Sequence, residues 1–176
     1  MRNQSGFTLA ETIMVVAVLA VLTAVAVPNY LSLLPDIRLK DAAGDIKSDI
    51  QLARQKAIRE NGNIALLFDM GANRYTIFVD NGAGGGATHA KNWIWDGTEE
   101  LIKSITLPDN VVMYAASFSG GVPRLRFDGR GLPNGLGGKV RLRNANNKCR
   151  GLVISMLGRI REQISTDGGL TWEDVD

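Results

Sequence analysis

The sequence predicts an α+β protein in which one long N-terminal helix packs on a β-rich head. Three observations lead to this fold class. An apolar run extends from Phe7 to Val27, apolar residues recur at three- and four-residue steps between Leu39 and Ile58, and short strand-like segments fill the chain from Ile64 onward. The first two patterns are typical of helices and the third of strands. The 176 residues suit one modest domain with an appendage.

The apolar run is long enough to cross a membrane. It occupies 21 positions, and its only polar side chains are those of Thr8, Glu11, Thr12 and Thr23. About 20 apolar residues span a bilayer, whereas the apolar core of a secretory signal has only ~7–15 residues. The short polar leader carries Arg2, and the positive-inside tendency keeps such a leader in the cytoplasm. We therefore expect one membrane span, with the rest of the chain outside the cytoplasm.

Glu11 is the unusual residue of this run. Insertion scales assign an ionised acid roughly 2.5–3.5 kcal/mol at the bilayer centre, and less toward the edges. An opposite charge makes a buried carboxylate tolerable, whereas an unpaired one costs several kcal/mol. Glu11 is therefore a functional candidate for which a cationic partner has to be found.

A second, amphipathic helical segment follows the apolar run. Its apolar stripe is formed by Leu39, Ala42, Ala43, Ile46, Ile50, Ala53, Ala57 and Ile58. We expect this stripe to pack on the head and the segment 61–63 (Asn-Gly-Asn) to end the helix. Pro28 and Pro35 lack a backbone donor, so we expect them to kink or locally melt the junction between the two halves.

The rest of the chain is β-rich, with strand-like segments separated by Gly, Asn, Asp and Pro clusters. The predicted strands are Ile64–Phe68, Arg74–Val79, Asn92–Trp95, Ile102–Leu107, Val111–Ala115, Leu125–Phe127, Lys139–Arg143, Gly151–Ser155 and Arg159–Ile164. About 115 residues are enough for an independent hydrophobic core.

The N-terminus resembles the type IV prepilin signal. The resemblance rests on Gly6-Phe7, on Thr8-Leu9-Ala10-Glu11 directly after this pair, and on Pro28 at the end of the apolar run. It implies that a prepilin peptidase cuts between Gly6 and Phe7 and that Phe7 becomes the methylated N-terminus. It also implies that Glu11 guides assembly with other pilins. Methylation keeps the positive charge of the new amine, which supplies the partner that Glu11 needs.

The head resembles that of FimT/GspH-type minor pilins and pseudopilins. The resemblance rests on segment 127–131 (Phe-Asp-Gly-Arg-Gly), on Val140-Arg141-Leu142, and on segment 152–155 leading to 158–161. It implies a pilin/pseudopilin fold, with two antiparallel sheets packed on the helix. The implied organisation is a cleaved leader (1–6), a transmembrane and filament-core helix (7–27), an amphipathic stalk helix (28–61) and a globular head (62–176).

Basic residues are concentrated in the last third of the chain. Between Arg124 and Arg161 the sequence has ten Lys and Arg residues, and Asp128 is the one acid. Strand alternation predicts that Arg141 and Arg143 share a face, as do Arg159 and Arg161. If these faces coincide, they form the basic stripe typical of polyanion binding.

Two interpretations of this stripe remain open. Alternating arginine and apolar residues are also typical of a half-exposed strand. Some FimT-type minor pilins bind DNA for natural transformation through a Gly-Arg-x-Arg motif, and segment 158–161 (Gly-Arg-Ile-Arg) is similar to it. The candidate DNA-binding residues are therefore Arg159, Arg161, Arg141 and Arg143.

Three other features carry no strong functional signal. Trp93 and Trp95 lie two apart; we expect them to pack over the stalk helix, with base stacking and anchoring of a neighbouring subunit as alternatives. Cys149, the single cysteine, is expected to be buried because an apolar strand follows it.

His89 and Cys149 lack the flanking ligands of a metal site. We expect no enzyme, metal or cofactor, and we interpret segment 165–172 as a structural Asp-box hairpin.

The sequence therefore predicts a minor type IV pilin or pseudopilin. We expect a precursor in the bacterial inner membrane, with its head in the periplasm, that later joins or primes a pilus. Its expected partners are a prepilin peptidase and other pilins. The alternatives are an H-type pseudopilin of a type II secretion system and a DNA-binding minor pilin for natural transformation.

Overall fold

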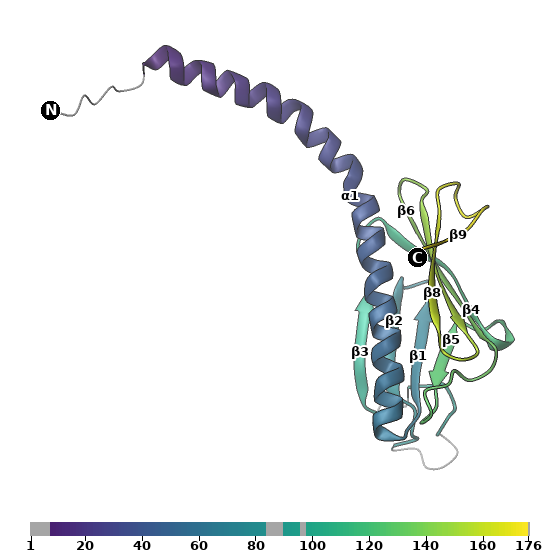
Figure 1. Ribbon diagram of the computed structural model, residues 1–176. Coiled ribbons are helices and arrows are strands. Elements are labelled where there is room, and N and C mark those ends of the chain that lie inside the picture. Colours follow the sequence, from purple (N-terminus) through teal and green to yellow (C-terminus); the bar gives the residue numbers. More distant parts are fainter. Residues whose placement is uncertain (1–7, 84–89, 96–97, 176) are drawn as a thin grey trace. The chain divides into compact units, whose positions relative to one another are not determined.

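The computed structural model describes residues 8–83, 90–95 and 98–175. The chain divides into two compact units, Met1–Leu34 and Pro35–Asp176. One helix, α1 (Leu9–Glu60), contributes residues to both (Figure 1). It contains Pro28 and Pro35 without a break in helical structure. The local melting expected there is therefore not observed, while a kink at either proline stays a prediction.

Both ends of α1 follow from local sequence. Thr8 caps the start, because its Oγ1 accepts the Glu11 N–H at 3.2 Å while Glu11 Oε2 accepts the Thr8 N–H at 3.5 Å. This reciprocal arrangement is a capping box. At the other end Asn61 has a positive φ of 46°, and the Gly62 N–H donates to the Ala57 carbonyl at 3.1 Å. This is a Schellman ending, and it confirms the predicted stop.

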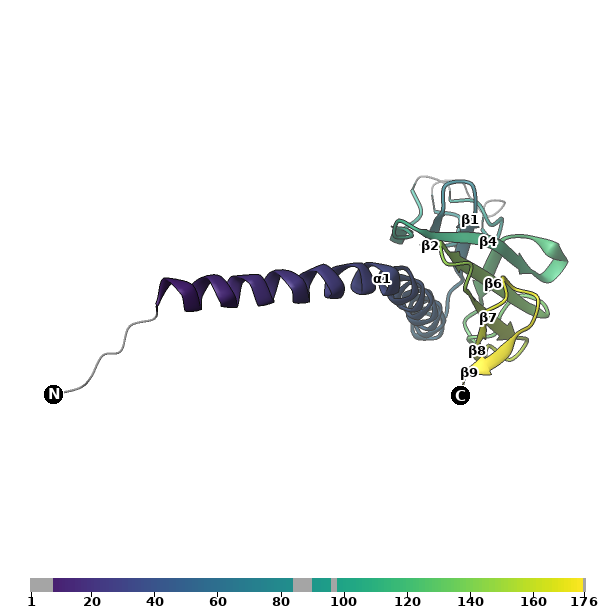
Figure 2. The same cartoon turned by 90° about the horizontal axis from the view of Figure 1, so that it is seen from above.

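The head contains two antiparallel sheets, which confirms the predicted fold class. The four-stranded sheet has the order β3-β2-β1-β5 and the five-stranded sheet the order β4-β6-β7-β8-β9. Figure 2 shows β6, β7, β8 and β9 following one another in the second sheet. The strands are β1 (Ile64–Asp69), β2 (Arg74–Val79), β3 (Leu101–Thr106), β4 (Val111–Phe118), β5 (Arg124–Phe127), β6 (Gly137–Asn144), β7 (Cys149–Ser155), β8 (Ile160–Ser165) and β9 (Glu173–Val175).

One predicted strand is wrong and one real strand was not predicted. Residues 92–94 form bends rather than a strand, because Trp93 has a φ of 69° that an extended chain excludes. The Asn92 side chain instead accepts the Ile94 N–H at 2.8 Å, which closes an Asx turn. Strand β9 (Glu173–Val175) is short and fully exposed, so it lacks the apolar alternation by which strands are recognised.

A single hydrophobic core joins α1 to both sheets, and its buried members all lie between Leu39 and Ile154. The second unit therefore contains its own core. The helix contributes most of the predicted stripe: Leu39, Ala42, Ala43, Ile46, Ile50, Ala53 and Ala57. Ile58, also predicted to be buried, is 49% exposed.

Asp49, an acid on the same helix, is buried at 4% exposure. Its carboxylate accepts the Tyr75 hydroxyl at 2.6 Å and Lys103 Nζ at 2.7 and 3.0 Å. Burial, and next the hydrogen bond to Asp49, raise the pKa of Tyr75 well above its ordinary value. These partners allow a charge to occupy the inner face of the helix, because buried charges require pairing.

Candidate functional site

The first candidate site is the beginning of α1. Every residue from Thr8 to Leu33 is exposed within this unit, and the helix is long and apolar enough to cross a membrane. Glu11 lies in its first turn, where a carboxylate interacts favourably with the helix dipole. Gly6 and Phe7, the predicted cleavage and methylation residues, lie outside the described residues.

The capping box gives Glu11 a local role that the sequence analysis missed. The signal was present, because Thr8-Leu9-Ala10-Glu11 has the Thr-x-x-Glu spacing of that motif. Any test of Glu11 must therefore separate the effect of its charge from its effect on the helix end.

The second candidate site is the outer face of the five-stranded sheet. The register places Arg141 beside Gly151 and Arg143 beside Cys149, while Gly151 pairs with Gln163 and Val153 with Arg161. Side chains of paired residues lie on the same face of a sheet. Arg141, Arg143 and Arg161 therefore share the face opposite the buried Leu142 and Leu152, although β7 separates their strands.

Each of these three arginines already has a partner. The Arg141 guanidinium lies 4.3 Å from the centroid of the Trp172 ring, and that of Arg143 lies 5.4 Å from the Tyr114 ring. Arg161 Nη1 lies 3.2 Å from Asp174 Oδ2 on β9, with both side chains about half exposed. Exposed ion pairs are worth about 0–1 kcal/mol. An anionic ligand could displace this last contact at little cost.

The Gly-Arg-Ile-Arg segment spans the end of the β7–β8 turn and the first two residues of β8. Gly158 has a φ of 75°, and its carbonyl accepts Arg54 Nη1 of α1 at 3.2 Å. Arg54 Nε also donates to the Gly131 carbonyl at 2.9 Å. Arg54, which the sequence analysis did not select, thus binds both the loop that contains Gly131 and the β7–β8 turn. The positive φ at Gly158 gives a structural reason for glycine at this position of the motif. Arg159 and Arg161 both line a cavity of about 450 Å³ beside Lys47.

The Asp-box interpretation agrees with the structure. Asp167 Oδ1 accepts the Ser165 hydroxyl at 2.6 Å and the Leu170 N–H at 3.0 Å. The Ser165 hydroxyl, and next the Thr171 hydroxyl, hold the pKa of Asp167 far below its ordinary value. Trp172 Nε1 donates to the Gly169 carbonyl at 3.0 Å, and a side chain at Gly151 would contact the Trp172 ring. The hairpin thus holds Trp172 against the outer face of the five-stranded sheet.

Trp93 and Trp95 of segment 92–95 have partners in the head, and their expected packing over the stalk helix stays a prediction. The guanidinium carbons of Arg126 and Arg124 lie 4.2 and 5.3 Å from the centroid of the Trp93 ring. Both arginines belong to β5, on the four-stranded sheet. Trp95 donates its indole N–H to the Glu99 carbonyl at 3.0 Å.

Cys149 is buried, as predicted. His89 lies outside the described residues. Within the described part of the chain, no group of three His, Cys, Asp or Glu side chains is placed to hold a metal ion.

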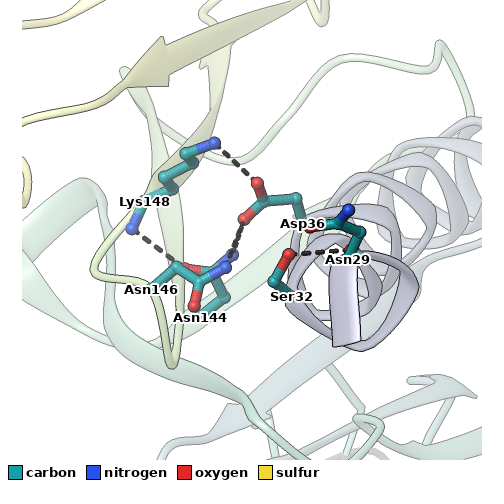
Figure 3. A network of polar contacts seen from close by, with 6 residues as sticks. All are labelled: Asn29, Ser32, Asp36, Asn144, Asn146 and Lys148. Carbon is teal, nitrogen blue, oxygen red and sulfur yellow. Dashed lines mark hydrogen bonds and ion pairs between the residues drawn. The ribbon is translucent and has the colours of Figure 1, made fainter. Parts of the chain in front are cut away.

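A polar network fixes α1 where it enters the head (Figure 3). Asp36 accepts Lys148 Nζ at 2.6 Å, Asn144 Nδ2 at 2.6 Å and Asn146 Nδ2 at 3.2 Å. These donors come from the end of β6 and the β6–β7 turn. The Lys148 hydrogen bond is the main reason that the pKa of Asp36 falls below its ordinary value.

This network predicts a pH-dependent contribution to stability. A carboxyl whose pKa is lower in the folded than in the unfolded state stabilises the fold above its unfolded pKa, and this stabilisation disappears as pH falls through the folded pKa. Asp36→Asn should therefore lower the free energy of unfolding by about 1 kcal/mol at pH 7, with a smaller difference near pH 3. Urea unfolding of residues 29–176 at both pH values measures this, and an equal difference at both would contradict it.

Comparison with known sequences adds to this geometry. The profile of the family described as "Type II transport protein GspH" matches residues 42–158, and the "Prokaryotic N-terminal methylation motif" matches residues 1–27. The chain is also 31% identical over 169 residues to the pilin-like protein PilA1 of Thermus thermophilus. That alignment covers 90% of this chain and 98% of PilA1.

Two solved structures have a similar fold. The minor pseudopilin EpsH from the type 2 secretion system of Vibrio cholerae gives a TM-score of 0.55 at 13% identity, covering 71% of this chain and 95% of EpsH. The type IV minor pilin FimU of Pseudomonas aeruginosa gives a TM-score of 0.50 at 15% identity, covering 69% of this chain and 85% of FimU. At these identities the likeness shows the fold alone. The GspH profile covers most of the chain, and the pilin-like relative matches nearly all of it, so the chain belongs to the GspH family of type IV pilin-like proteins.

Proposed function

We propose that this protein is a minor type IV pilin, a structural subunit that joins or primes a type IV pilus. In this proposal the leader (1–6) is removed by a prepilin peptidase, the apolar helix (7–27) first anchors the subunit in the inner membrane, and the head (62–176) lies in the periplasm on its stalk (28–61). The observation that carries the proposal is the acid at Glu11 in an exposed apolar helix, within the part of the chain that matches the N-terminal methylation motif.

Assembly gives this acid its partner. Cleavage before Phe7 creates a cationic amine, and methylation keeps its charge. The low dielectric of a filament core makes a lone carboxylate costly, whereas a neighbour's amine compensates it. Glu11 and the Phe7 amine of an adjacent subunit would thus set the register between subunits. Because the first half of α1 is mostly apolar and is exposed, the same helix can leave the lipid and pack in a filament.

An H-type pseudopilin of a type II secretion system is the alternative within the same structural class. The family description and the fold of EpsH support it. We favour the pilus because the sequence relative matched along most of the chain is a pilin-like protein, whereas support for the pseudopilin comes from the family description and from the fold of EpsH. Presence of the subunit in sheared surface pili would favour the pilus, and its restriction to the cell envelope would favour secretion.

Three variants test the role of Glu11. Glu11→Gln removes the charge but retains the capping box, which accepts glutamine, and Glu11→Ala removes both. We expect each to lower incorporation into filaments by about tenfold or more, since losing the pair costs more than 1.4 kcal/mol. Thr8→Ala, the matched control, removes the capping hydroxyl and keeps the charge, so incorporation should persist.

The measurement is an immunoblot of sheared filaments against the membrane fraction. All three precursors should insert and be cut normally. Normal incorporation of Glu11→Gln would show that the charge is dispensable, and loss with Glu11→Ala alone would assign Glu11 to helix capping.

DNA binding for natural transformation is a second candidate, favoured by the shared face of Arg141, Arg143 and Arg161. The protein comprising residues 29–176 should then retard duplex DNA at low salt. If these three and Arg159 each neutralise one phosphate, log K should fall against log salt with a slope of about −3.6. The double variant Arg159→Ala, Arg161→Ala should abolish retardation, and Arg74→Ala on the other sheet should not. The absence of retardation at low salt would exclude this candidate.

A further inference from the structure

Two adjoining cavities lie beside β5, on the side of the head formed by the four-stranded sheet. Their volumes are about 480 and 350 Å³, and both are lined by Asn134 and Gly135. Each falls within the range of ligand pockets. We call the two together the β5 recess. It belongs to a different sheet from Arg141, Arg143 and Arg161.

The β5 recess is cationic. Among the described residues that line it, Lys91, Arg124, Arg126 and Arg130 are basic and Asp128 is the one acid. Arg126 is compensated by Asp80, at 3.2 Å, and Arg130 by Asp128, at 2.7 Å. Within the described parts of the chain, Arg124 and Lys91 have no ion pair with an acidic side chain. These two cations are therefore available to an incoming anion.

Trp93 contacts two of the three arginines of the recess, Arg124 and Arg126. Arg126 Nη1 donates to the buried Asp80 at 3.2 Å and to the Lys91 carbonyl at 2.8 Å. Its guanidinium supports the Trp93 ring, which in turn lies against Arg124. Lys91 and Trp93 both have a positive φ, of 64° and 69°. Such conformations are strained and cluster at functional sites.

The recess also offers apolar contacts. Leu136 is 76% exposed and Met156 is 55% exposed, and both line the larger cavity. Tryptophan, methionine and arginine are the residues enriched at protein–protein interfaces. The combination of free cations and exposed apolar side chains matches a ligand that carries both carboxylates and apolar groups.

We propose that the β5 recess binds an acidic segment of another protein, with Arg124 and Lys91 pairing with its carboxylates and Leu136 and Met156 contacting its apolar side chains. Arginine suits this role because its planar fork binds carboxylates with two parallel hydrogen bonds. A nucleic acid fits less well. Guanidinium groups already lie over the Trp93 ring, and a phosphate backbone has no apolar groups for Leu136 and Met156.

The test uses the full-length protein in nonionic detergent. Its probes are a fluorescein-labelled peptide, Glu-Leu-Glu-Glu-Leu-Glu, the same peptide with glutamine for glutamate, and a short labelled duplex DNA. The acidic peptide should bind saturably, and the glutamine peptide should not. Arg124→Gln and Lys91→Gln should each weaken peptide binding by about tenfold, the effect of losing one charge-assisted contact. Arg74→Gln, an exposed cation on β2 of the same sheet, should bind like the wild type.

Several outcomes would overturn the proposal. The first is the absence of saturable peptide binding to the wild type, and the second is wild-type peptide affinity in both Arg124→Gln and Lys91→Gln. The third is DNA binding that Arg124→Gln abolishes while the peptide stays unbound. Lys91→Gln keeps the test valid even if Arg124→Gln unfolds the head, because Lys91 is exposed and its substitution leaves the core unchanged. Near-ultraviolet circular dichroism should therefore show the same thermal midpoint of unfolding for Lys91→Gln as for the wild type.

Discussion

A precursor carrying Gly6→Ala is expected to accumulate uncut in the membrane. We propose that the scissile bond lies between Gly6 and Phe7, and the methylation motif matches residues 1–27 around this bond. Glycine has no side chain, and a methyl group there would project at the bond to be cut. The effect should be a complete loss of the mature band, because no second Gly-Phe pair exists in the chain. Intact-mass measurement of the membrane fraction would show a protein that keeps residues 1–6.

This substitution should also block assembly. Without cleavage Phe7 stays within the chain and has no free amine, so Glu11 lacks the cation that compensates it. Gly6→Ala and Glu11→Gln should therefore both impair incorporation, but only the Gly6→Ala protein should keep residues 1–6. Ser5→Ala, the neighbouring leader position, is the control and should be cut normally. A mature-sized Gly6→Ala protein would mean that another protease acts here.

The second large effect concerns the buried charge of the stalk. Lys103→Met should lower the free energy of unfolding by about 2–3 kcal/mol, because it leaves Asp49 buried with only the Tyr75 hydroxyl as partner. The full cost of breaking a buried pair is about 3–5 kcal/mol. Here the Lys103 side chain is 45% exposed while that of Asp49 is 6% exposed, so water partly reaches the site and reduces the loss.

A double-mutant cycle separates the charge from the packing. Asp49→Asn with Lys103→Met removes both charges and should be more stable than Lys103→Met alone, since no uncompensated charge remains. Urea unfolding of residues 29–176, followed by tryptophan fluorescence, gives the four free energies. The prediction is wrong if the free energy of unfolding of Lys103→Met lies within about 0.5 kcal/mol of the wild-type value, the usual range for surface substitutions. Water would then replace the lysine as the partner of Asp49.

Local patterns predicted most of the secondary structure. The apolar stripe from Leu39 to Ala57 was found because helical periodicity repeats along one face. Segment 92–95 was misassigned because tryptophan and isoleucine favour strands, whereas Trp93 has a positive φ and contacts Arg124 and Arg126 of β5. The burial of Asp49 could not be recognised from local sequence, because its partners, Tyr75 and Lys103, lie 26 and 54 residues away.

The sequence by itself determined the N-terminal third of this protein. The prepilin-like signal, the apolar span, the acid at Glu11 and both helix ends are encoded by residues close together in the chain, so they can be recognised without a fold. Only the tertiary structure decided which arginines share a surface. It aligned Arg141 and Arg143 with Arg161 across β7, and it assembled Lys91, Trp93 and Arg124 into the β5 recess. The physical reason is that strand order and register, which place distant residues side by side, depend on packing of the whole core.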